Sequence, residues 1–327
     1  MTSPHLQRPD DGPAPLLPPA RFAVAVGSGK GGVGKSTVTV NLALALAEGG
    51  AAVGVLDADV YGPNIPLMVG LTRKEWTGDW TLARNPAMGP LPLLPPIERY
   101  GLKIMSAGFI LAEDQPMLLS AQTVRLLMRQ LVQQVDWGDL DYLIIDLPPG
   151  TGDIQQNLLQ ELALSGAVLV VTPQDVAHLD GKKALQQYRR AGVPLLGAVE
   201  NMSGFRCPHC GQSVDIFARV PDARAIWALG LEKLGAVPLD PAVSQAGDRG
   251  LPCAHRSCRR ATGDGLPPGG PAPGGQTPGS SANNPGSLAR QNPGRRYRPS
   301  WYSCSMCLHK RTRTRPNPPC LQPSCQA

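Results

Sequence analysis

The stretch GSGKGGVGKST, from Gly27 to Thr37, decides the fold of this chain. It contains the pattern G-x-x-x-x-G-K-[ST] without a mismatch, beginning at Gly29 and ending at Ser36. The apolar run Phe22–Val26 precedes it, and the helix-forming sequence TVTVNLALALA follows it. A strand, a glycine-rich turn and a helix in this order predict a loop whose backbone N–H groups and helix N-terminus bind a phosphate.

The side chains of this loop predict a nucleotide site with Mg²⁺. Lys35 is expected to reach the β- and γ-phosphates, and the Ser36 hydroxyl is expected to bind Mg²⁺. The residues expected to contact the nucleotide are Gly29, Lys30, Gly31, Gly32, Val33, Gly34, Lys35, Ser36 and Thr37.

Carboxylates end two further apolar runs. Asp57 and Asp59 close the run in VGVLDADV, and Asp146 closes the run in DYLIID. Because ligands of open parallel sheets bind at the carboxyl ends of the strands, these side chains are expected beside the phosphate loop. Asp146 is expected to hold the Mg²⁺ shell through water, and Asp57 or Asp59 is expected to orient the attacking water.

The sequence favours ATP over GTP as the nucleotide. No Asn-Lys-x-Asp segment follows a late strand to read guanine. Asn201 instead follows the apolar run Leu195–Glu200, and its amide is expected to donate to and accept from an adenine edge.

Apolar runs alternate with helical patterns between residues 21 and 252. The expected strands are Phe22–Val26, Ala52–Asp57, Leu102–Ser106, Tyr142–Asp146, Ala167–Thr172, Leu195–Glu200 and Leu234–Val237. The expected helices are Ser36–Ala47, Ala121–Val135, Ile154–Leu164, Leu179–Arg190 and Asp222–Leu229. Most of the strands are continuous apolar runs, as is typical of parallel strands buried on both faces. The alternation predicts an α/β fold with a doubly wound, mostly parallel sheet in one P-loop NTPase domain.

Charge and composition change sharply near the end of this domain. The net charge is +6, but residues 253–327 hold 11 Lys and Arg and 1 Asp, a balance of +10, which leaves −4 for residues 1–252. Residues 253–327 also contain 12 Pro and 9 Gly, a composition that buries too little apolar surface to fold. We therefore expect a flexible leader at 1–20, the ATPase domain at 21–252 and a disordered basic tail at 253–327.

The sequence also excludes two kinds of membrane-directed segment. No apolar run of about 18 residues is present to span a membrane. The N-terminus MTSPHLQRPDDGPAPLLPP carries acidic residues and prolines without an apolar centre, which excludes a secretory signal peptide. We expect a cytoplasmic protein with no membrane partner and no specific nucleic-acid partner, and a basic tail that acts as a nucleic-acid arm is a non-enzymatic alternative.

The chain contains 8 cysteines. In a reducing cytosol metal binding is expected rather than disulfide formation. Cys207 and Cys210 form the Cys-x-x-Cys pair of the segment 1–252 and offer two thiolates. A zinc ion or a cubane cluster needs four ligands. The other two therefore come from a second chain or from the tail, where Cys304 and Cys307 form another such pair.

The loop GKGGVGKST resembles the deviant Walker A group, the MinD/ParA/Mrp-type ATPases, through its extra lysine, Lys30. The resemblance implies that Lys30 crosses a dimer interface to the partner's nucleotide. A basic residue there offsets the charge of two facing triphosphates. The residues expected to act in catalysis are then Lys30, Lys35, Asp57 and Asp59.

Further segments resemble the Mrp/ApbC family of ATP-binding iron–sulfur cluster carriers. They are LDADVYGPNIP (Leu56–Pro66), DYLIIDLPPGTGD (Asp141–Asp153), VVTPQDVAHLDGKKAL (Val170–Leu185), VENMSGFRCPHCG (Val199–Gly211) and VPLDPAVSQAGDRGLP (Val237–Pro252). The resemblance implies a homodimeric ATPase with a 4Fe-4S cluster bridged between two pairs of Cys207 and Cys210. It further implies that cluster donors load this cluster and that the protein transfers it to apo iron–sulfur proteins.

The sequence departs from that family near both ends. The small N-terminal accessory domain of many bacterial members is not seen, and CAHRSCRRATGDGLPPGG stands where an apolar strand and a final helix usually follow GDRGLP. The abrupt change after Pro252 resembles translation of a shifted reading frame. The alternative function is a MinD/ParA-type positioning ATPase at a membrane or on DNA, although the tail sequence offers no amphipathic membrane helix.

Overall fold

The computed structural model describes residues 18–77, 93–111, 120–207 and 210–253 of the chain. Its centre is a sheet with the strand order β3-β4-β2-β5-β1-β6-β7-β8, and β9 pairs with β7. The strands are β1 (Ala20–Ser28), β2 (Val53–Asp57), β3 (Ile97–Arg99), β4 (Leu102–Ser106), β5 (Leu140–Asp146), β6 (Gly166–Val171), β7 (Leu195–Arg206), β8 (Ser213–Val214) and β9 (Lys233–Leu239). The pairs β3–β4 and β7–β8 are antiparallel and the other pairs are parallel, which confirms the predicted sheet.

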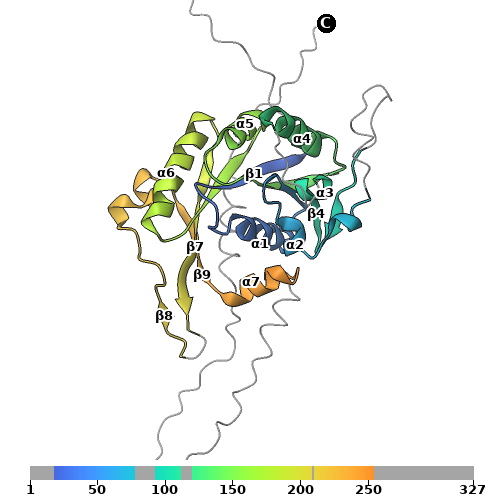
Figure 1. Ribbon diagram of the computed structural model, residues 1–327. Coiled ribbons are helices and arrows are strands. Elements are labelled where there is room, and N and C mark those ends of the chain that lie inside the picture. Colours follow the sequence, from blue (N-terminus) through green and yellow to red (C-terminus); the bar gives the residue numbers. More distant parts are fainter. Residues whose placement is uncertain (1–17, 78–92, 112–119, 208–209, 254–327) are drawn as a thin grey trace, which may run out of the picture.

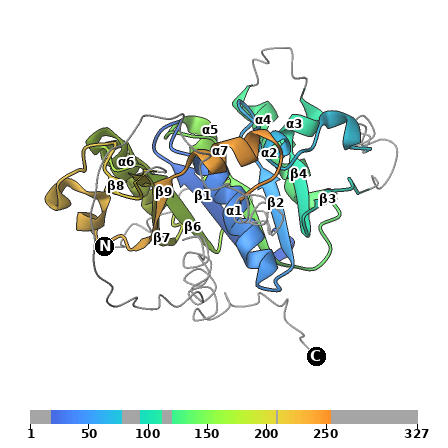
Figure 2. The same ribbon diagram turned by 90° about the horizontal axis from the view of Figure 1, so that it is seen from below.

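Helices cover both faces of this sheet. They are α1 (Lys35–Glu48), α2 (Ile65–Met68), α3 (Ala107–Ile110), α4 (Ala121–Gln133), α5 (Asp153–Glu161), α6 (Asp175–Arg190) and α7 (Pro241–Asp248). In Figure 1, α4, α5 and α6 lie on one side of β1, and α1, α2 and α7 lie on the other. Figure 2 shows the second group from below, with α1 and α7 in front of the sheet. Because both faces are covered, every residue of β2 and β6 is buried, as expected of continuous apolar strands.

The order of the strands places the ligand edge of the sheet at β1. The chain runs from β1 outward to β2 and β4 on one side, returns to β5 beside β1, and then crosses β1 to β6 and β7 on the other side. Such a reversal of direction opens a crevice at the carboxyl ends of the strands. The phosphate loop follows β1 and leads into α1, so it lies at this crevice.

The predicted helix Asp222–Leu229 is wrong. The segment forms two short 3-10 turns, η4 (Asp222–Arg224) and η5 (Ile226–Leu229), which Ala225 separates with an extended backbone at ψ 157°. The N–H of Ile226 donates to Nδ1 of the buried His178 at 3.1 Å, rather than to a carbonyl of its own helix. A contact with α6 thus overrides the local helical pattern.

Other differences concern boundaries and short elements. Strand β1 begins at Ala20, inside the predicted leader, and β7 continues beyond Glu200 to Arg206. Helix α6 begins at Asp175 rather than at Leu179. The sequence analysis missed α2, α3, α7, β3 and β8. Most of the leader and the segment 254–327 lie outside the described residues, so their predicted disorder stays a prediction. Within the described part, no helix is long and apolar enough to cross a membrane.

Candidate functional site

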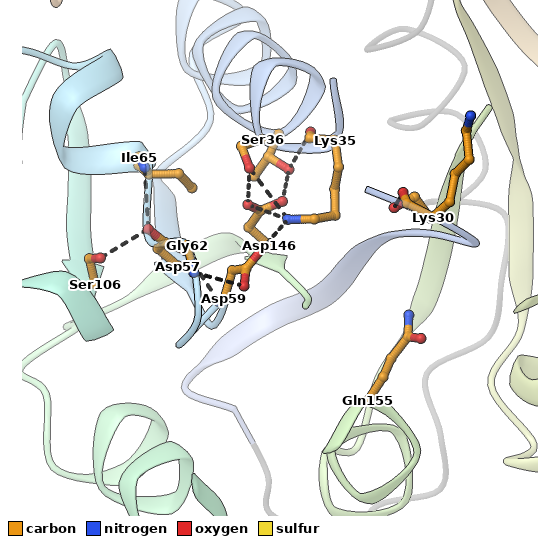
Figure 3. A network of polar contacts seen from close by, with 12 residues as sticks. Lys30, Lys35, Ser36, Asp57, Asp59, Gly62, Ile65, Ser106, Asp146 and Gln155 are labelled. Atoms are coloured by element: carbon orange, nitrogen blue, oxygen red, sulfur yellow. Dashed lines mark hydrogen bonds and ion pairs between the residues drawn. The ribbon is translucent and has the colours of Figure 1, made fainter. Parts of the chain in front are cut away.

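The phosphate loop brings Lys35 against a buried carboxylate. Lys35 is the first residue of α1, and Asp146 ends β5, the parallel neighbour of β1. The Lys35 Nζ lies 2.7 Å from Asp146 Oδ2 and 3.5 Å from Asp59 Oδ2. The lysine is 6% exposed and Asp146 is fully buried, so neither charge is satisfied by bulk water. Figure 3 shows these three side chains meeting at one point.

Two hydroxyl groups complete the contacts of Asp146. Ser36 donates to its Oδ2 at 2.6 Å, and Thr39 donates to its Oδ1 at 2.7 Å. Both hydroxyls come from the first two turns of α1, and Thr39 also donates to the Lys35 carbonyl at 3.0 Å. Serine and carboxylate oxygens are the ligands that Mg²⁺ prefers, and here they lie beside a lysine that is placed for phosphates. The donor set therefore fits a Mg–nucleotide.

Asp57 lies deeper than Asp59 in the same corner. Asp57 is opposite Asp146 in the β2–β5 register and is fully buried. It accepts hydrogen bonds from Ser106 Oγ at 2.9 Å and from the N–H groups of Ile65 at 3.2 Å and Asp59 at 3.3 Å. Asp59 Oδ1 accepts from the N–H of Gly62 at 3.3 Å. Asp57 thus braces the loop after β2, and Asp59 is the member of the pair that faces the cavity.

This crowding of carboxylates shifts their proton affinity. Burial raises the pKa of Asp57 to about 8, and the neighbouring Asp146 adds to that rise, against the opposing effects of Lys35 and the Ser106 hydrogen bond. Burial also raises the pKa of Asp59, and Lys35 opposes this shift. Burial thus disfavours the ionised forms of Asp57 and Asp59, although the ammonium of Lys35 opposes the rise of both pKa values.

A cavity of about 560 Å³ opens over this corner. The loop and the segment after β2 form its floor, and α7 forms the opposite wall. The lining residues include Ser28, Lys30, Gly31, Gly32, Gly34, Lys35, Ser36, Thr37, Asp59, Tyr61, Val243, Ser244, Gly247 and Asp248. This volume is in the range of small-molecule sites, about 300 to 1,000 Å³.

Lys30 is placed differently from Lys35. Figure 3 shows its amine pointing away from Asp146. Lys30 lines the nucleotide cavity and also a second cavity beside Val176, Ile216 and Arg224. Its position between the two is consistent with a role outside its own nucleotide site, but the role in a partner's site stays a prediction.

Two residues of the predicted loop set face inward. Val33 is 2% exposed and belongs to the apolar core. Gly29 packs against α6, where an added Cβ would lie 2.2 Å from the carbonyl carbon and oxygen of Asp180. Neither residue is among those that line the cavity. They shape the loop and leave the cavity to its other residues.

Asn201 contacts the loop backbone in this structure. Its Nδ2 donates to the carbonyl of Val33 at 2.9 Å, and the side chain is 7% exposed. The sequence analysis assigned this amide to an adenine edge, which stays a prediction. The observed contact commits one of the two N–H donors of the amide to the phosphate loop.

The cysteine pair occupies the turn of the β7–β8 hairpin. Phe205 and Arg206 pair with Val214 and Ser213. Beyond that pair, Cys207 N–H donates to the Gln212 carbonyl at 2.9 Å. Cys210 is exposed, while Cys207 is half-buried. Within residues 18–77, 93–111, 120–207 and 210–253, no group of three or more His, Cys, Asp and Glu is arranged to hold a metal ion. Cys304 and Cys307 lie outside these residues.

Sequence reasoning missed several residues of the site. Thr39 lies one helical turn after Lys35, so its position on the same face of α1 was readable from the spacing. Ser106 ends β4, the other neighbour of β2, and only the strand order brings it to Asp57. The helix α7, which forms one wall of the cavity, was not predicted, because its small residues do not form a clear helical pattern of apolar positions.

The chain matches a family model described as "ParA: NUBPL iron-transfer P-loop NTPase" over residues 20–264. It is 44% identical over 212 residues to the iron-sulfur cluster carrier protein of Methanocaldococcus jannaschii, a match that covers 64% of this chain and 70% of that protein. It is also 44% identical over 201 residues to the iron-sulfur cluster transfer protein NUBPL of Mus musculus, with 62% of this chain and 60% of that protein covered. The chain thus spans less than two thirds of the mouse relative.

Solved structures agree with the fold. A nucleotide-binding protein from Archaeoglobus fulgidus, in complex with ADP, superposes with a TM-score of 0.58 and 36% identity, covering 71% of this chain and 87% of that one. The cell division ATPase MinD of Pyrococcus furiosus superposes with a TM-score of 0.54 and 19% identity, covering 89% of this chain and 99% of that one. The second likeness shows the fold alone.

Proposed function

The chain belongs to the NUBPL-type iron-transfer P-loop NTPases of the ParA group, and from this membership we propose that it is an ATP-hydrolysing iron–sulfur cluster carrier. In this proposal it binds ATP with Mg²⁺, assembles a 4Fe-4S cluster on Cys207 and Cys210, and transfers the cluster to apo-proteins. The observation that carries the proposal is that one domain holds both a complete phosphate-binding corner and an exposed cysteine hairpin.

The nucleotide part rests on the contacts of Lys35. The lysine now lies between Asp146 and Asp59 and would turn to the β- and γ-phosphates of ATP, which offer it a stronger anion. Ser36 and Asp146 would hold Mg²⁺, directly and through water, and the metal supplies charge neutralisation at the phosphates. Asp59, which faces the cavity, is the better placed carboxylate to orient the attacking water, while Asp57 supports the loop behind it.

The cluster part rests on the number of thiolates. A 4Fe-4S cubane takes four cysteine ligands, and the described residues offer two of them on one turn. A second copy of the chain would supply the other two, which makes the carrier a homodimer with its cluster between the two hairpins. The cluster is cargo in this proposal, received from a donor and given to apo-proteins.

The comparisons favour this function over a positioning ATPase. The relatives from Methanocaldococcus jannaschii and Mus musculus, both 44% identical to this chain, are named as a cluster carrier and a cluster transfer protein. The likeness to MinD is at 19% identity and concerns the fold. We propose no membrane or nucleic-acid target for this domain.

Anaerobic reconstitution with iron and sulfide tests the proposal. We expect visible charge-transfer absorbance in the wild-type protein and its loss in the Cys207→Ala/Cys210→Ala variant, with ATP binding preserved in both. Loaded wild-type protein should also restore an apo 4Fe-4S acceptor. Equal absorbance in the two proteins would refute the assignment of the cysteine pair.

A further inference from the structure

Strand β7 connects the phosphate loop to the cysteine pair. Its residue Asn201 touches the loop, and the strand then continues to Arg206, the residue before Cys207. Two contacts on neighbouring residues, Glu200 and Asn201, hold the middle of this strand.

The first contact is a tight approach between Asn201 and the loop. Besides the hydrogen bond to Val33, the Asn201 amide lies directly over Gly34, where an added Cβ would be 2.2 Å from Nδ2. Gly34 has a φ of +81° and is the last residue before α1. A loop that shifts by a few tenths of an ångström on binding phosphate must therefore displace Asn201 or lose this contact.

The second contact fastens the base of the hairpin. Glu200 faces the side of β7 opposite to Asn201, because side chains alternate along a strand. Its carboxylate is buried and pairs with Lys233 Nζ at 2.5 Å and with Arg219 Nη1 at 3.5 Å. Two cations thus hold the strand next to the point where the loop contacts it.

Arg219 also ties the two limbs of the hairpin together. Its Nη2 donates to the Ser203 carbonyl at 2.6 Å on the outgoing limb, and Nε and Nη2 donate to Asp215 at 3.0 and 2.9 Å on the returning limb. One planar guanidinium therefore joins Glu200, the outgoing limb and the returning limb. The turn that carries Cys207 and Cys210 projects from this junction.

The strand is irregular between these contacts and the cysteines. Met202 has a φ of +55°, a left-handed conformation that costs energy for a residue with a side chain. The register of β7 against β9 shifts between Asn201 and Phe205. A break at this point lets the outer part of β7 change direction without disturbing the buried part.

We infer that Asn201 and Arg219 are positioning residues that make the geometry of the cysteine pair depend on the nucleotide. A movement of the loop displaces Asn201 and, with it, this part of β7. Arg219 then transmits the displacement of β7 to both limbs of the hairpin. The inference rests on the proposed function in that it treats Cys207 and Cys210 as the cluster ligands. It predicts that the thiols respond to nucleotide before any iron is present.

The test measures alkylation of Cys207 and Cys210 by iodoacetamide in the full-length, iron-free protein. The rate at each thiol is read by mass spectrometry without nucleotide, with Mg–ADP and with a saturating non-hydrolysable Mg–ATP analogue. In the wild type the analogue should change the rate by about fivefold, the lower end of common coupling between sites. In Arg219→Ala and in Asn201→Ala the change should fall to near onefold, while the Arg219 variant binds the analogue as the wild type does.

Two further variants separate coupling from simple loss of structure. Asp215→Ala removes an exposed partner of Arg219 and should reduce the response without unfolding the domain. Arg224→Ala removes a nearby exposed arginine whose ion pair is with Asp175 on α6 rather than with the hairpin, so it should keep the full response. The inference would be overturned if the analogue changed the alkylation rates in the Arg219 and Asn201 variants as it does in the wild type. It would also be overturned if the nucleotide had no effect on these rates in the wild type.

The result can be told apart from the fate of the proposed function. If the thiols respond as described and the wild type fails to load iron, the coupling stands and the cluster assignment fails. If iron loads on the cysteine pair and the thiols show no response, the cluster assignment stands and the coupling is wrong.

Discussion

At the scale of single residues, the site is organised by one cation among three carboxylates. Asp57, Asp59 and Asp146 share Lys35 as their close basic partner in this corner, and two of the three are fully buried. Such an arrangement is unfavourable on its own, and in the function we propose it would be relieved when phosphates draw the lysine away and Mg²⁺ is held at Asp146.

Replacing Lys35 should therefore abolish tight nucleotide binding. Lys35→Ala removes the charge-assisted contact to the β- and γ-phosphates, and we expect a loss of about 2 kcal/mol or more, roughly 30-fold in Kd. Calorimetry of Mg–ATP binding measures this loss. Lys183→Ala, which removes an exposed lysine paired with Asp180 on α6, is the matched control. Unchanged affinity in the Lys35 variant would contradict the assignment of the phosphate loop.

The structure brings together the contiguous part of the predicted site, while the roles of its residues stay predictions. The loop, Lys35, Ser36 and the strand-ending aspartates follow from local patterns whose place in a parallel sheet is fixed by general rules. Thr39 and Ser106 were not predicted, because each contacts an aspartate from a segment distant in the sequence. Arg219 was not predicted for the same reason, since no local sequence pattern indicates its contact with the Ser203 carbonyl.

At the scale of elements, α6 supports the phosphate loop from behind. The start of the loop approaches α6 so closely that glycine is required at Gly29, where an added Cβ would meet the backbone of Asp180 at 2.2 Å. Gly31 is different, because no atom lies within 4 Å of an added Cβ there.

This difference predicts opposite outcomes for two alanine substitutions in one loop. Gly29→Ala should lower the free energy of unfolding by about 1 to 3 kcal/mol, because it forces α6 away from the loop. Gly31→Ala should unfold at the wild-type temperature. Thermal unfolding of the two variants decides the point. Equal stability of the two would show that the loop and α6 do not pack as described.

The contact of α6 with η5 predicts a pH dependence of stability. His178 is fully buried, its Nδ1 accepts from Ile226 N–H, and its ring meets Trp227 edge to face. Burial lowers the pKa of His178 from its ordinary value of 6.5. Below about pH 6.5 the unfolded chain therefore takes up a proton that the folded protein refuses, and stability falls as the pH falls, by up to about 1.4 kcal/mol per pH unit.

The variant His178→Asn tests this origin. Asparagine keeps an oxygen acceptor near Nδ1 but does not titrate, so the loss of stability between pH 6.5 and 5 should become smaller. Chemical unfolding at several pH values measures it. If the variant and the wild type lose the same stability over this range, His178 is not the titrating group.

The elements themselves were predictable to different degrees. Long apolar strands and the helices α1, α4, α5 and α6 were recovered because their patterns are periodic and their burial is strong. The helix predicted at Asp222–Leu229 failed because a hydrogen bond from Ile226 to His178 breaks it. Short elements such as α7 and β8 depend on partners distant in sequence, which a local pattern does not contain.

At the scale of the whole molecule, the last described residues, near residue 250, pack against earlier parts of the domain. Tyr100 Oη donates to the Gly250 carbonyl at 2.6 Å, and Gly250 at φ +67° packs against Gly70. The Cys253 thiol donates to the Ala242 carbonyl at 3.6 Å. The segment that walls the nucleotide cavity is thus anchored before residue 254.

A chain that ends after Cys253 should therefore keep its stability and its ATP affinity. It should bind polyanions such as heparin more weakly, because residues 254–327 hold 11 Lys and Arg and 1 Asp, a balance of +10. Unfolding temperature, calorimetry and heparin chromatography measure the three properties. Loss of reconstituted iron in the shortened chain would show that cysteines beyond Cys253 act as ligands.

The most direct test of the proposed carrier is the iron content of a sized dimer. Anaerobically reconstituted protein, separated by size in the presence of Mg–ATP, should contain about four iron atoms per dimer, as one cubane with four thiolates requires. The Cys207→Ala/Cys210→Ala variant should contain almost none while it still binds ATP. Four iron atoms on each monomer, or full iron loading in the double variant, would contradict a cluster shared between two cysteine hairpins.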